Sequence, residues 1–300
     1  MKKIAFCSPL LPKKTGIAAF NHLFIQQLIK QDKFQFDIYD TDPQQSNKFQ
    51  QSYQARDIRQ LINNPQARKQ YHQFIYHFGN NARFHYPTLR LLRQQPGIVV
   101  LHDTVMYHLM VGQNEGELSL AGLWLSLQHN NTLINSHNSK QQLQHIINSS
   151  PDKNPVYYPY PQRFPLLKEI LNGALSVVVH SQTAVANILK QGYAGQLQVI
   201  KLPYHRDQNT KQAITATSAD NNVKEYIRSE LKPITDKKLK RLIARQLLQQ
   251  SRNKKQGKTI ITNLGFAGST KRIDVIKKAI YCLPQTLKDK IILLIIGEGH

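Results

Sequence analysis

His102 and Asp103 directly follow residues 97–101, a short run of mostly β-branched residues. A histidine at the end of such a run can hydrogen-bond a ligand hydroxyl or stabilise charge that develops during a reaction. Asp103 could orient the imidazole ring or cap a following helix. A histidine satisfied by neighbouring backbone groups is the open structural alternative. The pair is the first candidate for chemistry in this chain.

Two loops combine glycine with cations between a predicted strand and a predicted helix. The first spans residues 8–17 and contains Thr15-Gly16, and the second spans 265–272 and ends in Lys271-Arg272. Backbone N–H groups at a helix N-terminus can bind phosphate, and glycine allows the ligand to approach closely. Two cations could also hold a diphosphate. The second loop lacks the Walker spacing G-x-x-x-x-G-K-[S/T], and ordinary solvated turns are the alternative for both loops.

The elements that position these residues alternate between strand and helix patterns. Apolar runs predict strands at residues 3–7, 34–39, 74–78, 97–101, 174–179 and 197–202. Helical spacing predicts helices at residues 17–28, 86–94, 105–111, 118–127, 164–172 and 183–190. We place Leu23, Phe24 and Leu28 on one apolar face of the first helix. Residues 43–70 are polar and predict a loop with an exposed helix around 58–62.

This alternation predicts an α/β fold with βαβ units and a parallel sheet. Ligands of such sheets bind beyond the carboxyl ends of the strands. The notable polar residues all fall at such ends: residues 8–16, Asn80, His102-Asp103 and His180-Ser181. Their coincidence is the strongest physical indication of a site.

The C-terminal third of the chain has a different character. Residues 207–257 contain Asn, Thr and Ser tracts and then many cations around Leu239, Leu242, Ile243 and Leu247, which predicts a linker and a basic amphipathic helix. Strands at 259–264 and 291–296 flank a helix at 273–281. We therefore expect a domain at 1–206, a basic linker and helix at 207–257, and the start of a second domain at 258–300. That start is too short to close its own core, so we expect a truncated domain.

Composition narrows the classes of partner. The 300 residues carry 40 Lys and Arg against 18 Asp and Glu, a net charge of +22, which favours nucleic acid, anionic lipid or phosphate-bearing substrates. A bias in the amino-acid composition of the source genome would explain the positive charge equally well. The sequence lacks the interleaved aromatics and cations of a nucleic-acid binder, so we do not expect that partner.

The sequence also lacks an apolar stretch of 18 residues and a signal peptide. Cys7 and Cys282 are interpreted as reduced core thiols of a cytoplasmic protein.

Metal binding is not expected either. Only the number of histidines in this region suggests a metal site: His77, His85, His102 and His108. They fall on different elements, without the tight spacing of metal ligands.

Taken in order, five segments resemble the family 4 glycosyltransferases, enzymes of the GT-B fold. The segments are residues 8–17, 76–81, 99–103, 177–181 and 264–274, which together with the intervening elements cover most of the chain apart from 43–70 and 207–257. The resemblance implies two Rossmann-like domains that face a cleft. The N-terminal domain would hold a glycan or lipid-linked acceptor, and the C-terminal domain would hold most of a nucleotide-sugar donor. Transfer would retain the anomeric configuration, without metal or cofactor, in cell-surface polysaccharide biosynthesis.

The resemblance also implies roles for single residues. Gly16 would lie near the donor phosphates, and His102 matches the active-site histidine near the transferred sugar. Lys271 matches the basic residue that contacts the diphosphate, where a cation stabilises the leaving group. Arg272 is a second donor-side candidate, because Phe266 stands where many members have an arginine. We expect Asn80, Asn81 and Asp103 on the acceptor side.

One departure from the family pattern leaves two hypotheses open. Members carry a paired-glutamate motif that grips the donor, and the chain ends before any such motif, with Glu298 in a different turn. The first hypothesis is a transferase whose basic helix at 237–255 rests on anionic lipid at the inner face of the membrane. The second is a remnant, or half of a split enzyme completed by a second chain, that binds an acceptor or a partner without catalysis.

Overall fold

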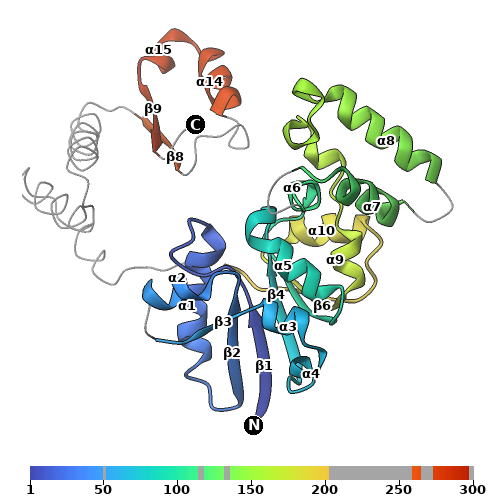
Figure 1. Cartoon of the computed structure of the whole chain (residues 1–300). Coiled ribbons are helices and arrows are strands. Elements are labelled where there is room, and N and C mark those ends of the chain that lie inside the picture. The colour runs from blue at the N-terminus through green and yellow to red at the C-terminus, as the bar shows by residue number, and fades with distance from the viewer. Residues whose placement is uncertain (50–51, 114–117, 132–135, 203–258, 265–272, 297–300) are drawn as a thin grey trace, which may run out of the picture. The chain divides into compact units, whose positions relative to one another are not determined.

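The computed structural model describes residues 1–49, 52–113, 118–131, 136–202, 259–264 and 273–296 (Figure 1). The chain divides into two compact units, Met1–Pro203 and Tyr204–His300. The basic segment 207–257 predicted from the sequence lies outside the described residues, as does the loop 265–272.

The first unit is built on a seven-stranded sheet in which every pair of neighbouring strands is parallel. Its strands are β1 (Lys2–Cys7), β2 (Phe34–Asp40), β3 (Ala55–Asp57), β4 (Gln73–Phe78), β5 (Gly97–Leu101), β6 (Ala174–Val179) and β7 (Gln196–Val199). The strand order β3-β2-β1-β4-β5-β6-β7 reverses direction between β1 and β4. This Rossmann-like arrangement confirms the predicted α/β fold with a parallel sheet and puts the topological switch point next to β1.

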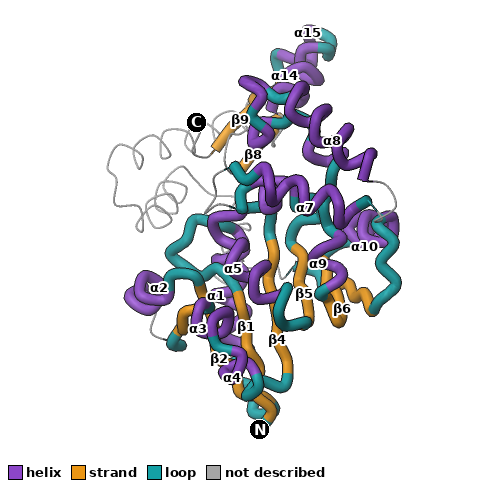
Figure 2. Tube along the Cα trace, turned by 45° about the vertical axis from the view of Figure 1, so that its right-hand side comes forward, coloured by secondary structure: helices purple, strands orange, loops and turns teal. Residues whose placement is uncertain are grey.

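Helices connect the strands and cover the sheet (Figure 2). They are α1 (Gly16–Leu28), α2 (Pro43–Phe49), α3 (Arg59–Asn63), α4 (Pro65–Arg68), α5 (Ala82–Leu92), α6 (Tyr107–Val111), α7 (Leu120–Asn130), α8 (Ser136–Ser149), α9 (Lys168–Asn172) and α10 (Gln182–Lys190). Three short 3-10 helices lie between α8 and α9: η1 (Pro151–Lys153), η2 (Pro155–Tyr157) and η3 (Pro161–Arg163).

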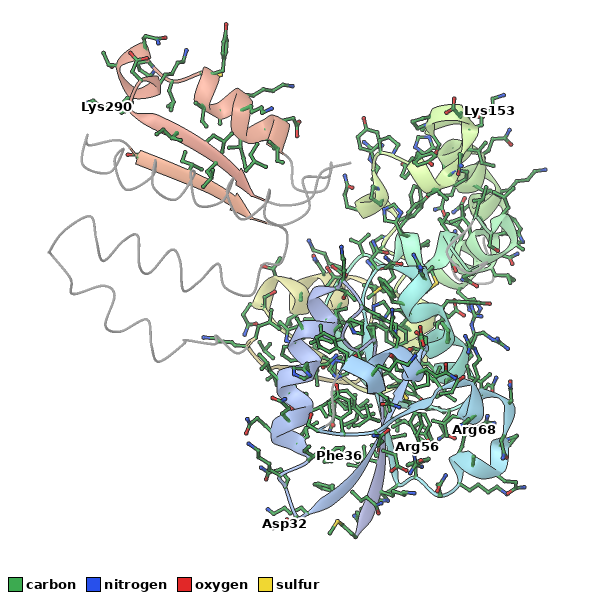
Figure 3. The ribbon with its side chains drawn as sticks, turned by 60° about the vertical axis from the view of Figure 1, so that its left-hand side comes forward. Asp32, Phe36, Arg56, Arg68, Lys153 and Lys290 are labelled. Carbon is green, nitrogen blue, oxygen red and sulfur yellow. The ribbon has the colours of Figure 1, made fainter. Side chains whose placement is uncertain are left out.

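Alternation along the strands divides the core into two faces, because successive side chains of a strand point to opposite sides. In β1, Ala5 and Cys7 belong to a large apolar cluster that includes side chains of α3, α5, α9 and α10. Phe6, between them, belongs to a smaller cluster with Ile25 of α1 and Ile38 of β2. Figure 3 shows the side chains around the sheet. The face covered by α1 is the one that carries the histidines described below.

The buried face of α1 differs from the predicted one. Ile17, Ala18, Asn21 and Ile25 are buried, whereas Leu23 is 41% exposed. The buried positions follow the i, i+3, i+4 spacing of a helix, and buried Asn21 belongs to that face because its Nδ2 donates to Ser8 Oγ at 2.5 Å. Apolar residues alone therefore gave the wrong face.

Residues 43–70 are more structured than predicted. They form α2, β3, α3 and α4, and the helix near 58–62 is not exposed, since Ile58, Leu61 and Ile62 are buried in the large cluster. The sequence around it is mostly polar, so the apolar side formed by these three residues, which packs against the sheet, is not recognised from the sequence pattern.

Smaller differences concern element ends and the cysteines. The helix predicted at 164–172 begins only at Lys168, the last strand ends at Val199, and α8 had no sequence prediction. Cys7 is buried as expected, but Cys282 is exposed, so its interpretation as a core thiol was wrong.

Gly97 occupies a position where the sheet has no room for a side chain. A Cβ atom built there would lie 2.7 Å from the carbonyl oxygen of Phe74 and 2.7 Å from Cε2 of Tyr76. We expect Gly97→Ala to lower the free energy of unfolding by about 1–3 kcal/mol, because the neighbouring strand must shift. Chemical denaturation measures this, with Gly16→Ala as control, since a Cβ at Gly16 meets nothing within 4 Å among the described residues. Equal stability of the two variants would contradict the packing argument.

The described part of the second unit is a βαβ arrangement. Strands β8 (Thr259–Leu264) and β9 (Ile291–Ile296) pair in parallel, with α14 (Ile273–Tyr281) and α15 (Gln285–Lys288) between them in sequence. In neither unit does a described helix combine the length and apolarity needed to cross a bilayer.

Candidate functional site

Three histidines from neighbouring strands gather at the carboxyl end of the sheet. His77 lies in β4, and His102 and His180 directly follow β5 and β6. Val100 pairs with both His77 and Val178, so residues two positions beyond Val100 and Val178 share the face of His77. His77 Nδ1 lies 3.0 Å from His102 Nε2, and the rings of His102 and His180 have centroids 4.7 Å apart. The strand register therefore assembles a row of imidazoles.

Aromatic rings of α1 and β1 enclose this row. The Phe20 ring meets His102 edge-on, with centroids 5.2 Å apart, and lies 5.8 Å from His180. Phe6 of β1 packs on His77 at 4.7 Å, which leaves His77 only 1% exposed. His102 and His180 remain partly exposed. The row therefore runs from a buried end at His77 to an accessible end at His102 and His180.

Burial keeps His77, His85 and His102 neutral. Desolvation lowers the pKa of His77 well below its usual value, and the nearby histidines add to the effect. Burial, followed by the positive charge that His180 can carry, lowers the pKa of His102 to about 3. Burial also lowers the pKa of His85, in α5, to about 4. The hydrogen bond that His85 Nδ1–H donates to the carbonyl oxygen of His77 at 3.1 Å acts in the opposite direction but is the smaller effect. Near pH 7 His77 and His102 thus carry no charge, and their imidazoles can exchange hydrogen bonds.

The hydrogen bonds also select tautomers. His180 donates Nδ1–H to the carbonyl oxygen of Ile200 at 2.7 Å. Between His77 Nδ1 and His102 Nε2 one nitrogen must donate, and His77 Nε2 is buried without a partner among the described residues. If His77 donates, that orphan nitrogen is a lone pair, which is less costly than a buried unpaired N–H. This arrangement leaves Nδ1–H of His102 as a donor for a ligand.

The three predicted acceptor-side residues shape the turns beside the histidines. Asn80 Oδ1 accepts from the backbone N–H groups of His108 and Leu109 at the start of α6, at 2.8 and 3.2 Å. Asn81 caps α5 by accepting from the N–H of Arg83, and Asp103 Oδ2 accepts from the N–H of Asn80 at 3.0 Å. Asn80 and Asp103 thus hold the loops after β4 and β5 together. Asp103 and Asn81 are also exposed, so they remain accessible to a ligand.

Gly16 lies at the start of α1, at the same edge of the sheet. Thr15 caps the helix by accepting from the N–H of Ile17 at 3.1 Å, and Gly16 is exposed. The predicted donor-side residues Lys271 and Arg272 lie outside the described residues. The described structure therefore brings together Gly16, Asn80, Asn81, His102 and Asp103 at the carboxyl edge of one sheet.

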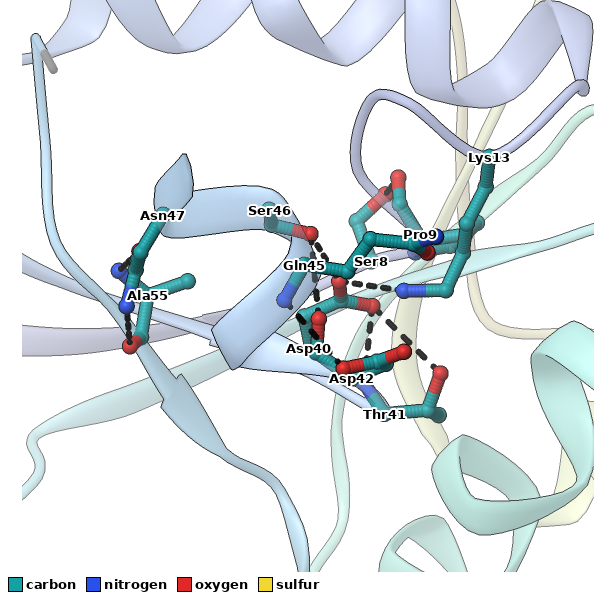
Figure 4. A network of polar contacts seen from close by, with 10 residues as sticks. All are labelled: Ser8, Pro9, Lys13, Asp40, Thr41, Asp42, Gln45, Ser46, Asn47 and Ala55. Atoms are coloured by element: carbon teal, nitrogen blue, oxygen red, sulfur yellow. Dashed lines mark hydrogen bonds and ion pairs between the residues drawn. The ribbon is translucent and has the colours of Figure 1, made fainter. Parts of the chain in front are cut away.

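A buried ion pair lies on the other side of the switch point, after β1 and β2 (Figure 4). Lys13 forms an ion pair with Asp40, whose side chain is fully buried. Ser46 Oγ donates to Asp40 Oδ2 at 2.6 Å, and the N–H of Thr41 donates to Oδ1 at 2.7 Å. Asp40 thus fixes the loops after β1 and β2 against each other.

Sequence reasoning missed two features of this edge. It treated His77 and His102 as unrelated histidines, although His77 belongs to a predicted strand and His102 ends its neighbour. It also passed over Arg83 and Arg90, whose spacing of seven residues puts both on one face of α5. Both pairs can be found in the sequence. The strand order is needed to bring the two histidines together, and the helix is needed to put the two arginines on one face.

Comparison of the chain with protein-family models, with curated proteins and with solved structures gave no match. Within the described residues, no three His, Cys, Asp or Glu side chains are grouped so that they could hold a metal ion.

Proposed function

We propose that this protein is a glycosyltransferase that moves a sugar from a nucleotide-sugar donor to a glycan or lipid-linked acceptor. The proposal starts from the five segments that resemble family 4 glycosyltransferases. The observation that carries it further is the row of His77, His102 and His180 at the carboxyl edge, beside Gly16 and the switch point. In open parallel sheets this edge is where ligands bind.

The reaction proposed is substitution at the anomeric carbon of the donor sugar. The bond from that carbon to the diphosphate oxygen breaks, a bond to an acceptor hydroxyl oxygen forms, and the hydroxyl proton leaves with the diphosphate. His102 is neutral, so its role would be to donate Nδ1–H to a sugar hydroxyl or to an oxygen that gains charge. His77 would act as a positioning residue, since its bond to His102 Nε2 sets the ring and its tautomer.

The test is release of nucleoside diphosphate from UDP-glucose, UDP-galactose, UDP-N-acetylglucosamine and GDP-mannose by the purified chain. We expect His102→Ala to lower turnover by about 10- to 100-fold, the equivalent of one lost hydrogen bond to a charged group. His77→Gln should lower turnover less and alter its pH profile, because it changes the partner of His102 without removing the donor. Arg163→Gln, an exposed position in η3, is the control and should not alter turnover.

Equal turnover of wild type and His102→Ala would contradict a catalytic role for this residue. Binding of UDP and GDP, measured by calorimetry, separates the two hypotheses left open by the sequence. A chain that binds neither nucleotide and releases no diphosphate is a binding module and not a transferase.

A further inference from the structure

A cavity of about 390 Å³ opens at the carboxyl edge of the sheet, beside the switch point between β1 and β4. Its walls come from the loop after β1, from the loop and helix after β2, and from α3 and α5. Four of its side chains are cationic and one is a carboxylate: Lys13, Arg59, Arg83, Arg90 and Asp42. Its volume lies in the range of small-molecule sites, roughly 300–1,000 Å³.

The four cations are not equivalent. Lys13 is neutralised by buried Asp40, and Arg59 pairs with Asp57 at 3.1 Å. Arg83 and Arg90 have no ion pair with another residue of the described ranges. These two guanidinium groups are therefore the cations of the lining that are not held in an ion pair.

The geometry of α5 directs both arginines to this cavity. Positions 83 and 90 are seven residues apart, two helical turns, with Tyr86 and Pro87 on the same face between them. All four residues line the cavity. Pro87 has no N–H, so the carbonyl oxygen of Arg83 lacks its usual partner in the helix. A planar guanidinium presents a fork of N–H donors that matches phosphate oxygens in pairs.

The rest of the lining suits the remainder of a ligand. Asp42, Thr41 and Gln45 offer a carboxylate, a hydroxyl and an amide on the wall after β2 (Figure 4). Such groups hydrogen-bond hydroxyls, and a carboxylate next to a phosphate subsite disfavours a second anionic group there. The lining thus fits one phosphate joined to a hydroxyl-rich group better than it fits a polyanion.

We infer that this cavity binds a phosphorylated sugar or polyol, with its phosphate on Arg83 and Arg90 and its hydroxyls on Asp42, Thr41 and Gln45. That this ligand is the acceptor, and that the acceptor therefore carries a phosphate, rests on the proposed function. The phosphate binding itself does not. The ligand has two sources with the same chemistry, a soluble sugar phosphate or the headgroup of a phospholipid.

The test is calorimetric binding of glucose 1-phosphate, glucose and inorganic phosphate to the full chain. A salt concentration of about 0.15 M limits non-specific attraction by the net charge. We expect glucose 1-phosphate to bind more tightly than either fragment. Arg83→Gln and Arg90→Gln should each weaken it by about 10-fold or more. Arg163→Gln is the matched control, and unchanged circular dichroism shows that the exposed substitutions leave the fold intact.

Vesicles distinguish the sources. Phosphatidylcholine vesicles containing phosphatidylinositol test the headgroup, and vesicles containing phosphatidylserine test charge alone. Binding to phosphatidylinositol above phosphatidylserine, lost in the Arg83→Gln/Arg90→Gln double variant, assigns the site to a lipid headgroup. Binding of glucose 1-phosphate alone, lost in the same variant, assigns it to a soluble ligand.

The outcomes keep the two proposals separate. The cavity proposal is overturned if the double variant binds glucose 1-phosphate and phosphatidylinositol as wild type does, or if wild type binds neither. Release of nucleoside diphosphate then still tests the transferase. If the arginines control binding but no nucleoside diphosphate is released, the transferase fails and the phosphate site stands.

Discussion

Replacing Asp40 with alanine is expected to lower the free energy of unfolding by about 3–5 kcal/mol. Its carboxylate is fully buried, and its partner Lys13 is only 8% exposed. The substitution leaves the Lys13 ammonium without its counter-ion and deprives Ser46 Oγ of the nearer of its two acceptors, at 2.6 Å against 3.3 Å for the carbonyl oxygen of Asp42. A buried charge that loses its partner costs far more than the pair contributed. Denaturant unfolding monitored by circular dichroism measures the loss.

Asp57→Ala provides the matched control, because it removes the same side chain from an exposed ion pair. Arg59 is 62% exposed and Asp57 29% exposed, so this pair should contribute no more than about 1 kcal/mol. Asp40→Asn, which keeps the shape but not the charge, should fall between the two. Similar losses for Asp40→Ala and Asp57→Ala would show that burial does not govern the Lys13–Asp40 pair.

The free energy of unfolding is expected to fall as the pH is lowered from about 6.5 to about 5. In the folded protein the pKa of His85 is about 4 and that of His102 about 3, whereas an unfolded histidine has a pKa of about 6.5. The unfolded chain therefore binds protons in this window and the folded chain does not, which favours unfolding as the pH falls. Fully buried His85 alone should contribute up to about 1.4 kcal/mol per pH unit, and the effect vanishes above the unfolded pKa. Urea unfolding at about pH 7, 6 and 5 measures the slope.

Variants identify the source of that slope. His85→Gln should flatten it by up to about 1.4 kcal/mol per pH unit, since one site of proton uptake is removed from the unfolded chain. His72→Gln changes an exposed histidine and should leave the slope nearly unchanged. A wild-type stability that stays constant between pH 7 and 5 would argue against buried neutral histidines.

Local patterns predicted most elements of the first unit. The aliphatic runs at 97–101 and 174–179 are strands because β-branched side chains fit a buried sheet, and the polar residues after them mark its carboxyl edge. Prediction failed where burial depends on a distant partner. Ile58 and Leu61 are surrounded by polar residues in the sequence. They belong to the core only because they pack against the sheet. Asn21 is buried because Ser8, in the loop after β1, accepts its hydrogen bond.

The sequence by itself determined that the protein is an α/β chain with a parallel sheet and a polar carboxyl edge, because these follow from local periodicity. The tertiary structure decided which residues meet at that edge. The strand order puts β4 and β5 side by side, so that His77 and His102 share a hydrogen bond across 25 residues of chain. The same order sets α5 beside the loops after β1 and β2, which turns Arg83 and Arg90 into cavity walls. Such neighbours depend on non-local strand pairing, which a one-dimensional pattern does not specify.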